Sequence, residues 1–155
     1  MEHIVNQIHL SLIKNKKTIA IAESCTGGLL SSFLTHISGS SQYFILGVIA
    51  YSNQAKARVL KIPTSLILKK GAVSYAVAKK MAQAVRKLAR ADLGIGITGI
   101  AGPTGGTPQK PVGTVFICID TKNKKLCRKF QFKGNRTAIR KKTALTALKL
   151  LKEIF

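Results

Sequence analysis

The sequence predicts an α/β fold: one domain, residues 1–155, in which helices cover both faces of a mixed β-sheet, giving three α/β/α layers. Short apolar runs alternate along the chain with stretches whose apolar residues recur at helical spacing, an order typical of α/β proteins. Two apolar runs near the C-terminus are separated only by TKNKK, which indicates an antiparallel hairpin and therefore a mixed sheet. A chain of 155 residues with 46% hydrophobic content suffices for one core and is short for two.

The chain begins with a predicted helix and a predicted buried strand. Val5, Ile8 and Leu12 recur at helical spacing with polar residues between them, which indicates an amphipathic helix. The segment 17–23, KTIAIAE, is a continuous run of small and β-branched apolar residues. Such a run is typical of a central strand covered on both faces.

A second helix and a second strand follow. The segment 27–39 presents one apolar helical face, formed by Leu30, Phe33, Leu34 and Ile37. The segment 43–53 is an apolar run that ends in polar residues, as expected for a strand. A short helix is predicted at 52–60, capped by Ser52 or Asn53.

The second half of the chain repeats the alternation. A longer helix begins after Ser74 and carries an apolar stripe made of Val77, Met81, Ala84, Val85 and Leu88. A buried strand is predicted at 93–99, whose glycines allow a neighbouring element to approach closely, and a long Gly/Pro-rich loop follows at 99–113. The hairpin at 114–132 precedes a terminal helix from about Asn135, which is expected to bury Ala144, Ala147, Leu148, Leu151 and Phe155.

The charge is unusual, because 26 Lys and Arg oppose only 5 Asp and Glu, for a net charge of +21. Such an excess can bind nucleic acid or another phosphate-bearing partner through counterion release. The alternative, which we favour, is a background of solvated lysines, because they are dispersed over predicted helix surfaces and turns. Trp is absent, and no ladder of aromatic and basic residues typical of single-strand binding is present.

The cysteines and the apolar segments indicate the cellular compartment of the protein. Cys25, Cys118 and Cys127 are an odd number without metal-ligand spacing or a CxxC motif, which favours a reducing cytoplasm. The N-terminus lacks the apolar core and cleavage site of a signal peptide. No segment reaches the roughly 18 apolar residues of a membrane span. We therefore expect a cytoplasmic protein without membrane contact.

A first candidate site lies at AESCTGG, residues 22–28, where a strand gives way to a helix. The first N–H groups of a helix are unpaired and carry the positive end of its dipole, so they can stabilise an oxyanion or a phosphate. Gly27 and Gly28 would let a ligand approach the backbone. The alternative is that Ser24 or Thr26 simply caps the helix.

A nucleophile at this junction requires a base. The three histidines, His3, His9 and His36, lie in predicted helices away from the glycine-rich loops and are expected to be surface or packing residues. Without a histidine partner or a cysteine-protease signature, Cys25 is expected to be a packing residue.

Lys56 is the alternative base. It would lie in the first turn of its short helix, where the dipole, partial burial and nearby cations all lower its pKa toward a neutral amine that can deprotonate serine. Tyr51, at the end of the preceding strand, could relay the proton or orient the lysine. The alternatives are a solvated lysine and a half-buried structural aromatic.

A glycine loop and an arginine pair are candidates for holding an anion. TGIAGPTGG, residues 98–106, forms an open backbone turn that could hold a phosphate, although it matches neither the P-loop nor the dinucleotide-binding pattern. Arg136 and Arg140 lie one turn apart at the start of the last helix and could clamp an anion. The alternative is that both arginines are merely exposed.

Six motifs in order resemble the CinA C-terminal domain family: AESCTGG, YSNQAK, GAVS, TGIAGPTGG, KPVGTV and GNRTAIR. They extend from residue 22 to residue 140. Stand-alone members of the family include nicotinamide mononucleotide deamidases, and larger relatives carry a further N-terminal domain. The resemblance implies a serine amidohydrolase that converts nicotinamide mononucleotide (NMN) to nicotinic acid mononucleotide and ammonia, in pyridine nucleotide salvage, without a metal or cofactor.

The resemblance also implies residue roles. Ser24 becomes the nucleophile, Lys56 the general base and Tyr51 an assisting hydroxyl. The other residues implied to bind substrate comprise the oxyanion-binding backbone, the glycine loop, the arginines and one carboxylate: Thr26, Gly27, Gly28, Thr98, Gly99, Gly102, Gly105, Arg136, Arg140 and Glu23. Glu23 would orient a ribose hydroxyl or the lysine, or serve as a buried structural hydrogen-bonding group.

One residue departs from the family pattern. Relatives often have an acidic residue where this chain has Asn135, which still caps a helix.

Other functions than an enzyme stay open. The basic charge leaves a nucleic-acid-binding or competence-related accessory protein as the main alternative. A non-catalytic nucleotide-binding module is a third reading. Similar proteins are often dimeric, so a homodimer is expected, although the sequence does not indicate which face would pair.

Overall fold

The computed structural model describes residues 2–155 and contains a five-stranded sheet in the order β2-β1-β3-β4-β5. Its strands are β1 (Ile19–Glu23), β2 (Phe44–Ile49), β3 (Leu93–Gly99), β4 (Thr114–Thr121) and β5 (Lys125–Gln131). Strand β1 is parallel to both β2 and β3, whereas β3, β4 and β5 pair antiparallel. The predicted mixed sheet, including its C-terminal hairpin, is confirmed.

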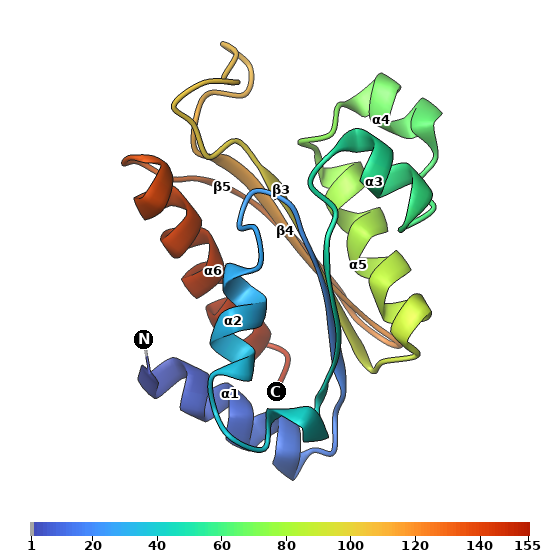
Figure 1. Ribbon diagram of the computed structural model, residues 1–155, viewed down its shortest axis with the longest axis vertical. Coiled ribbons are helices and arrows are strands. Elements are labelled where there is room, and N and C mark those ends of the chain that lie inside the picture. The colour runs from blue at the N-terminus through green and yellow to red at the C-terminus, as the bar shows by residue number, and fades with distance from the viewer. Residues whose placement is uncertain (1) are drawn as a thin grey trace.

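Helices cover both faces of this sheet (Figure 1). One layer contains α1 (Glu2–Lys14), α2 (Leu29–Thr35) and α6 (Arg136–Lys152). The other contains α3 (Asn53–Arg58), α4 (Thr64–Lys70) and α5 (Tyr75–Ala89), and a short 3-10 turn, η1 (Ser40–Gln42), precedes β2. The predicted three-layer α/β/α architecture is therefore confirmed. None of the helices within residues 2–155 has both the length and the apolar character needed to cross a bilayer.

Alternation along the strands divides the core between the two layers. In β1 every residue is buried, with Ile19 and Ile21 in the core shared with α1, α2 and α6 and Ala20 and Ala22 in the core shared with α5. In β3, a Cβ atom on Gly94 or Gly96 would overlap the backbone of α5. The expected close approach to this strand is confirmed: α5 packs directly on the backbone of β3.

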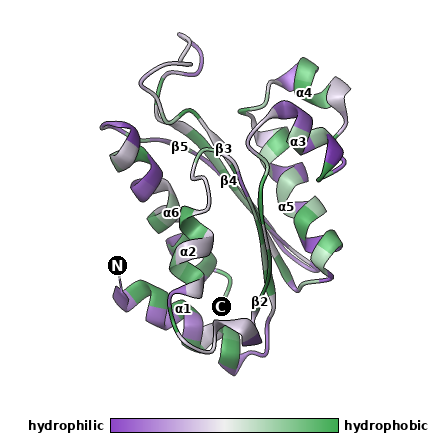
Figure 2. Cartoon of the chain, in the orientation of Figure 1, coloured by the Kyte–Doolittle hydropathy of each residue, from purple (hydrophilic) through white to green (hydrophobic). Residues whose placement is uncertain are grey.

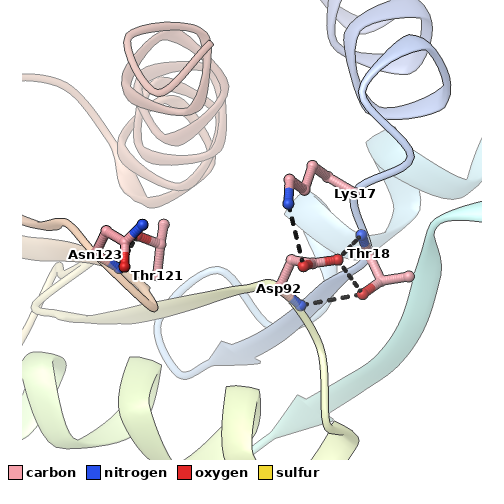
Figure 3. A network of polar contacts seen from close by, with 5 residues as sticks. All are labelled: Lys17, Thr18, Asp92, Thr121 and Asn123. Atoms are coloured by element: carbon pink, nitrogen blue, oxygen red, sulfur yellow. Dashed lines mark hydrogen bonds and ion pairs between the residues drawn. The ribbon is translucent and has the colours of Figure 1, made fainter.

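A polar cluster fixes β1 against β3 at the end where both strands begin (Figure 3). The Asp92 carboxylate accepts hydrogen bonds from the Thr18 N–H (2.9 Å) and Oγ1 (3.0 Å) and from Lys17 Nζ (3.4 Å). The Asp92 N–H donates back to Thr18 Oγ1 at 3.0 Å. These contacts, led by the Thr18 backbone, lower the pKa of Asp92. The two strands are thereby aligned so that their C-terminal ends emerge together.

The hairpin between β4 and β5 is closed at the same end of the molecule. Thr121 Oγ1 accepts hydrogen bonds from the backbone N–H groups of Asn123 (3.3 Å) and Lys124 (2.8 Å), and Figure 3 shows the first of these residues beside it. Cys118 and Cys127 lie directly opposite each other in this hairpin and are joined as a disulfide. The cysteine spacing did not predict this pair, because opposition in a hairpin depends on strand register rather than on a local motif.

Some local expectations were wrong. Helix α4 was not anticipated, because its apolar residues are consecutive and show no helical period. Helix α2 ends at Thr35, short of the predicted stop. Leu88 is exposed, because it lies in the last turn of α5 on the rim of a groove formed with residues 59–63. Phe155 is also exposed, because α6 ends at Lys152 and helical spacing no longer applies.

Candidate active site

A pocket of about 260 Å³ lies where β1 and β3 end. The carboxyl ends of parallel strands are the usual ligand-binding edge of such sheets. The volume is slightly below the roughly 300–1,000 Å³ typical of small-molecule sites. The lining side chains come from the strand ends, from α3 and from the loops before α5, after β3 and at the start of α6: Ser24, Cys25, Tyr51, Asn53, Lys56, Ala72, Val73, Thr98, Gly99, Ile100, Ala101, Gly102, Thr104, Gly105 and Arg136.

Ser24 is held in this pocket by a tight turn after β1. The Gly27 N–H donates to the Ser24 carbonyl at 3.1 Å, which closes the turn. Gly27 and Gly28 have φ angles of +59° and +93°, a backbone region that residues with a Cβ rarely adopt. The two glycines are therefore required to place Ser24 at the pocket.

Glu23 fixes the helix that follows the turn. Its buried carboxylate accepts hydrogen bonds from the N–H groups of Gly28 (3.1 Å), Leu30 (3.2 Å) and Ser31 (2.8 Å). The Ser31 hydroxyl donates a fourth bond at 2.7 Å. Glu23 thus caps α2, the role that the sequence suggested for Ser24 or Thr26, and it does not line the pocket. A carboxylate at this helix end is also favoured by the helix dipole.

Lys56 is the buried partner of Ser24. Its side chain is only 2% exposed, and its Nζ atom lies 3.0 Å from Ser24 Oγ. The same Nζ atom donates to the carbonyl oxygens of Ala50 (2.9 Å) and Tyr51 (3.2 Å). The short helix α3 that carries Lys56 is capped by Ser52, whose Oγ accepts the Ala55 N–H at 2.9 Å.

The electrostatics favour a neutral lysine amine. Burial lowers the pKa of Lys56, with the neighbouring Cys25 acting weakly in the opposite direction. The expected direction of the shift is therefore confirmed, with burial as its main cause. A neutral amine has two protons and one lone pair. Two carbonyl acceptors can take the two protons, which leaves the lone pair facing the hydroxyl of Ser24.

Cys25 serves as part of the pocket wall. Burial raises the pKa of its thiol to about 12, so the sulfur remains protonated at neutral pH and is a poor nucleophile. Cys25 belongs to the buried core, as expected. Its Sγ atom lies 3.1 Å from where a Cβ on Gly99 would stand, so Gly99 is needed for this packing. Between the two neighbouring side chains, the serine is the one with a base.

Arg136 connects three walls of the pocket. Its guanidinium donates to the carbonyl of Gly102 and to the hydroxyl of Tyr51, both at 2.8 Å. Tyr51 is exposed, and its hydroxyl contacts this arginine rather than Ser24 or Lys56. Among the described residues that line the pocket there is no carboxylate, and with Lys56 neutral Arg136 is the only cationic side chain. The pocket is therefore suited to an anionic ligand.

Arg140 is separated from Arg136 and does not line the pocket. It donates to the Thr26 carbonyl through Nε at 3.3 Å and a terminal nitrogen at 2.8 Å. The two arginines therefore do not form one anion clamp. Thr26, Gly27 and Gly28 also stand outside the pocket lining. The N–H groups of the two glycines already donate within the turn, to Ser24 and Glu23.

The glycine loop does reach the pocket. Thr98, Gly99, Gly102 and Gly105 all line it. The Thr98 hydroxyl donates to the Ala72 carbonyl at 2.9 Å, which ties β3 to the loop before α5.

Several residues that line the pocket carry no sequence signal that by itself assigns them to the site. They come from α3, the loop before α5 and the glycine loop: Asn53, Ala72, Val73, Ile100, Ala101 and Thr104. The GAVS motif at 71–74 was the available signal for Ala72 and Val73. In residues 2–155, no three His, Cys, Asp or Glu side chains gather in a group that could ligate a metal.

The chain is similar to known proteins over nearly its whole length. The sequence model of the CinA C-terminal domain matches residues 1–155. A CinA-like protein of Thermotoga neapolitana is 46% identical over 153 residues, covering 99% of this chain and 36% of the relative. A CinA-like protein of Geobacter metallireducens is 50% identical, covering 87% of this chain and 33% of the relative. The chain thus spans about a third of the length of these curated relatives.

Solved structures match over nearly the whole chain. The competence/damage inducible protein CihA from Agrobacterium tumefaciens superposes with a TM-score of 0.95 at 36% identity, covering 98% of this chain and 93% of that one. A competence-damaged protein (CinA) superfamily protein from Escherichia coli gives a TM-score of 0.95 at 30% identity, covering 99% and 90%.

Proposed function

The chain belongs to the CinA C-terminal domain family, and we propose that it is an amidohydrolase that converts nicotinamide mononucleotide to nicotinic acid mononucleotide and ammonia. The observation that carries the proposal is the buried pair of Ser24 Oγ and Lys56 Nζ, 3.0 Å apart at the pocket. A serine beside a lysine of lowered pKa is an arrangement for attack on an amide carbonyl. The identity of the substrate rests on the family resemblance.

The reaction would proceed in two halves. Neutral Lys56 accepts the hydroxyl proton as Ser24 Oγ attacks the carboxamide carbon, forming a tetrahedral intermediate. The protonated lysine then returns that proton to the departing nitrogen, and ammonia leaves an ester on Ser24. Lys56 next deprotonates a water molecule that attacks the ester, and the proton passes to Ser24 Oγ as nicotinic acid mononucleotide is released.

The surroundings would stabilise charge in this reaction. The amides of Gly27 and Gly28 are used within the turn, so we assign the developing oxyanion to the preceding amides of Cys25 and Thr26. An oxyanion donor of this kind is typically worth about 3 kcal/mol. Arg136 is the cation available to the 5′-phosphate, with the backbone of the 99–105 loop beside it. Tyr51 would act by orienting Arg136, its hydrogen-bonding partner.

The test is ammonia release from nicotinamide mononucleotide by the purified protein and by Ser24→Ala. We expect the variant to lose roughly three orders of magnitude or more in kcat. Ser32→Ala, which changes an exposed serine on α2, is the matched control and should retain full activity. A Ser24→Ala protein with most of its activity would rule out the mechanism. Stabilisation of both proteins by the nucleotide without turnover would indicate a non-catalytic binding module.

Nucleic-acid binding is a second candidate function, favoured by the many Lys and Arg side chains that form no ion pair. Among residues 2–155 only three ion pairs form: Lys17–Asp92, Arg86–Asp120 and Arg128–Glu153. Most of the 26 Lys and Arg residues therefore have no carboxylate partner. Binding of a labelled DNA or RNA duplex, measured by anisotropy, should then fall steeply as salt rises. Absence of binding at low salt would dispose of this candidate.

A further inference from the structure

Helix α3 contributes to the pocket a polar side chain that binds no other group of the protein. The helix has the sequence NQAKAR and is largely hydrophilic (Figure 2). Its first residue, Asn53, lines the pocket together with Lys56. The two residues are three positions apart, so they share one face of the helix. Within residues 2–155, no hydrogen bond forms to the exposed side chain of Asn53, since the neighbouring Ser52 caps the helix.

Most other polar side chains of the pocket are already engaged. Ser24 and Lys56 contact each other at 3.0 Å. Arg136 donates to the Tyr51 hydroxyl at 2.8 Å, and the Thr98 hydroxyl donates to a backbone carbonyl at 2.9 Å. An asparagine side chain has two N–H donors and an oxygen with two lone pairs. At position 53 all of these are available to a ligand.

Asn53 lies between the two ends of the pocket. The reactive end is buried, because Ser24 is 7% exposed and Lys56 only 2% exposed. The cationic end is Arg136, whose partner Tyr51 is 59% exposed. Asn53 stands between Tyr51 and Lys56 along the chain, and all three residues line the pocket. In nicotinamide mononucleotide the ribose likewise stands between the ring that bears the carboxamide and the phosphate.

We propose that Asn53 makes the site specific for a ribose by hydrogen bonding to its 2′ and 3′ hydroxyls. This inference rests on the proposed function. Asn53 Oδ1 accepts from one hydroxyl while Nδ2 donates to the other, a pairing that the amide group allows and that a 2′-deoxyribose cannot complete. Asn53 is thus a specificity-determining residue rather than a participant in the attack on the carboxamide.

Two other side chains could be considered for the same role. The family resemblance implies that Glu23 contacts a ribose hydroxyl, but its carboxylate caps α2 and it does not line the pocket. Thr104 does line the pocket and belongs to the glycine loop. That loop is bound by Arg136 through the Gly102 carbonyl, which places Thr104 at the phosphate end. Asn53 is therefore the side chain best placed for the sugar.

The exposure of Asn53 sets the expected size of the effect. A buried site that hydrogen-bonds a substrate hydroxyl rejects an analogue without it very strongly, because its polar group is left unpaired. Water can replace the missing hydroxyl at an exposed side chain such as Asn53. We therefore expect a preference of about tenfold for the ribose over the 2′-deoxyribose compound.

The rates of ammonia release from nicotinamide mononucleotide and from its 2′-deoxyribose analogue test this role. The preference in kcat/KM of about tenfold should fall to about twofold or less in Asn53→Leu, which has a similar volume and no polar atom. Gln54→Leu is the matched control, because Gln54 is exposed on the same helix and does not line the pocket, and it should keep the full preference. A purely structural role of Asn53 would lower both rates alike and leave the preference unchanged.

Asn53→Asp provides a rescue by a conservative change. An aspartate of the same shape can still accept hydrogen bonds from both hydroxyls, so it should retain the preference for the ribose. Its charge repels the phosphate that both compounds carry, so KM should rise for both of them. An Asn53→Asp protein that lost the preference as completely as Asn53→Leu would contradict the proposed contact.

Binding to the Ser24→Ala protein separates this inference from the proposed function. By isothermal titration calorimetry, this protein should bind nicotinamide mononucleotide about tenfold more tightly than the 2′-deoxyribose analogue, and addition of Asn53→Leu should remove the difference. Ammonia release by the unmodified protein without a preference for the ribose overturns the role of Asn53 alone. Preferential binding without ammonia release overturns the proposed function alone. Absence of nucleotide binding and of ammonia release overturns both. Circular dichroism verifies that each variant is folded.

Discussion

Lys56 Nζ lies 3.0 Å from Ser24 Oγ, and the two residues follow neighbouring parallel strands. Ser24 comes directly after β1, and Lys56 belongs to the short helix after β2. The register pairs Glu23 with Ile49, so both chain segments leave the sheet at the same level. The carbonyls of Ala50 and Tyr51 accept hydrogen bonds from the same amine. The distance between nucleophile and base is thus set by strand pairing.

Activity should depend on pH through Lys56. Its pKa is lowered from 10.5 by burial, and only the neutral amine can accept the Ser24 proton. The value of kcat/KM should therefore rise tenfold per pH unit below that pKa and reach a plateau before 10.5. Lys56→Arg keeps its cation at every accessible pH and should be inactive throughout. Initial rates of ammonia release check this, and a flat profile for the unmodified protein would contradict it.

The same lysine should make the free energy of unfolding depend on pH. A lysine whose pKa is lower in the folded chain binds fewer protons folded than unfolded between the two pKa values. Stability should therefore increase with pH from the folded pKa up to about 10.5, the unfolded value. Lys56→Met, which has no titrating group, should remove this increase. Urea unfolding at a series of pH values measures it, with Lys80→Met on an exposed face of α5 as the control.

The two arginines of α6 should have different effects on catalysis. Arg136 lines the pocket, so Arg136→Gln should raise KM for nicotinamide mononucleotide about tenfold to a hundredfold, with a smaller effect on its nucleoside, which lacks the phosphate. Arg140 does not line the pocket and donates to the Thr26 carbonyl of the nucleophile turn, so Arg140→Gln should lower kcat for both compounds alike. If both substitutions changed KM and kcat equally for the nucleotide and the nucleoside, Arg136 would not form an anion site.

Glu23 should contribute far more to stability than a surface carboxylate. Its carboxylate accepts four hydrogen bonds in a buried site, so Glu23→Ala should lower the free energy of unfolding by about 2–5 kcal/mol. Glu153 makes a bidentate ion pair with Arg128 that is nearly half exposed, and Glu153→Ala should cost less than about 1 kcal/mol. Chemical denaturation measures both. Equal losses would mean that the capping interaction is not important for stability.

The three layers and the C-terminal hairpin could be predicted from the sequence, because both depend on local periodicity. Leu12 and Val85 lie where helical spacing predicts, and the run at 17–23 contains the fully buried strand β1. Helix α4 was missed because tertiary packing of Ile67, rather than an amphipathic pattern, accounts for its burial. Periodicity is a local signal, so it fails where a segment is short and packed by its neighbours.

The candidate site was predictable in part. Residue type and motif pointed to Ser24 and Lys56, and strand pairing brings them together. The cap by Glu23 was not foreseeable, because its donors lie five to eight residues away, beyond the usual capping spacing. Spacing could not distinguish Arg140 from Arg136, since one helical turn relates them. In the structure Arg140 binds the Thr26 carbonyl in the turn after Ser24, and Arg136 lines the pocket.

The strand order also determines when β1 can pair with both of its neighbours during synthesis. Strand β1 is buried on both faces and has β2 and β3 as neighbours, yet β3 follows it only much later in the chain. At about 5–20 residues per second, the roughly 70 residues between them take about 4–14 s to translate. During that interval the apolar strand IAIAE has at most one of its two partners. We expect ribosome-associated chaperones to bind this apolar segment during that interval.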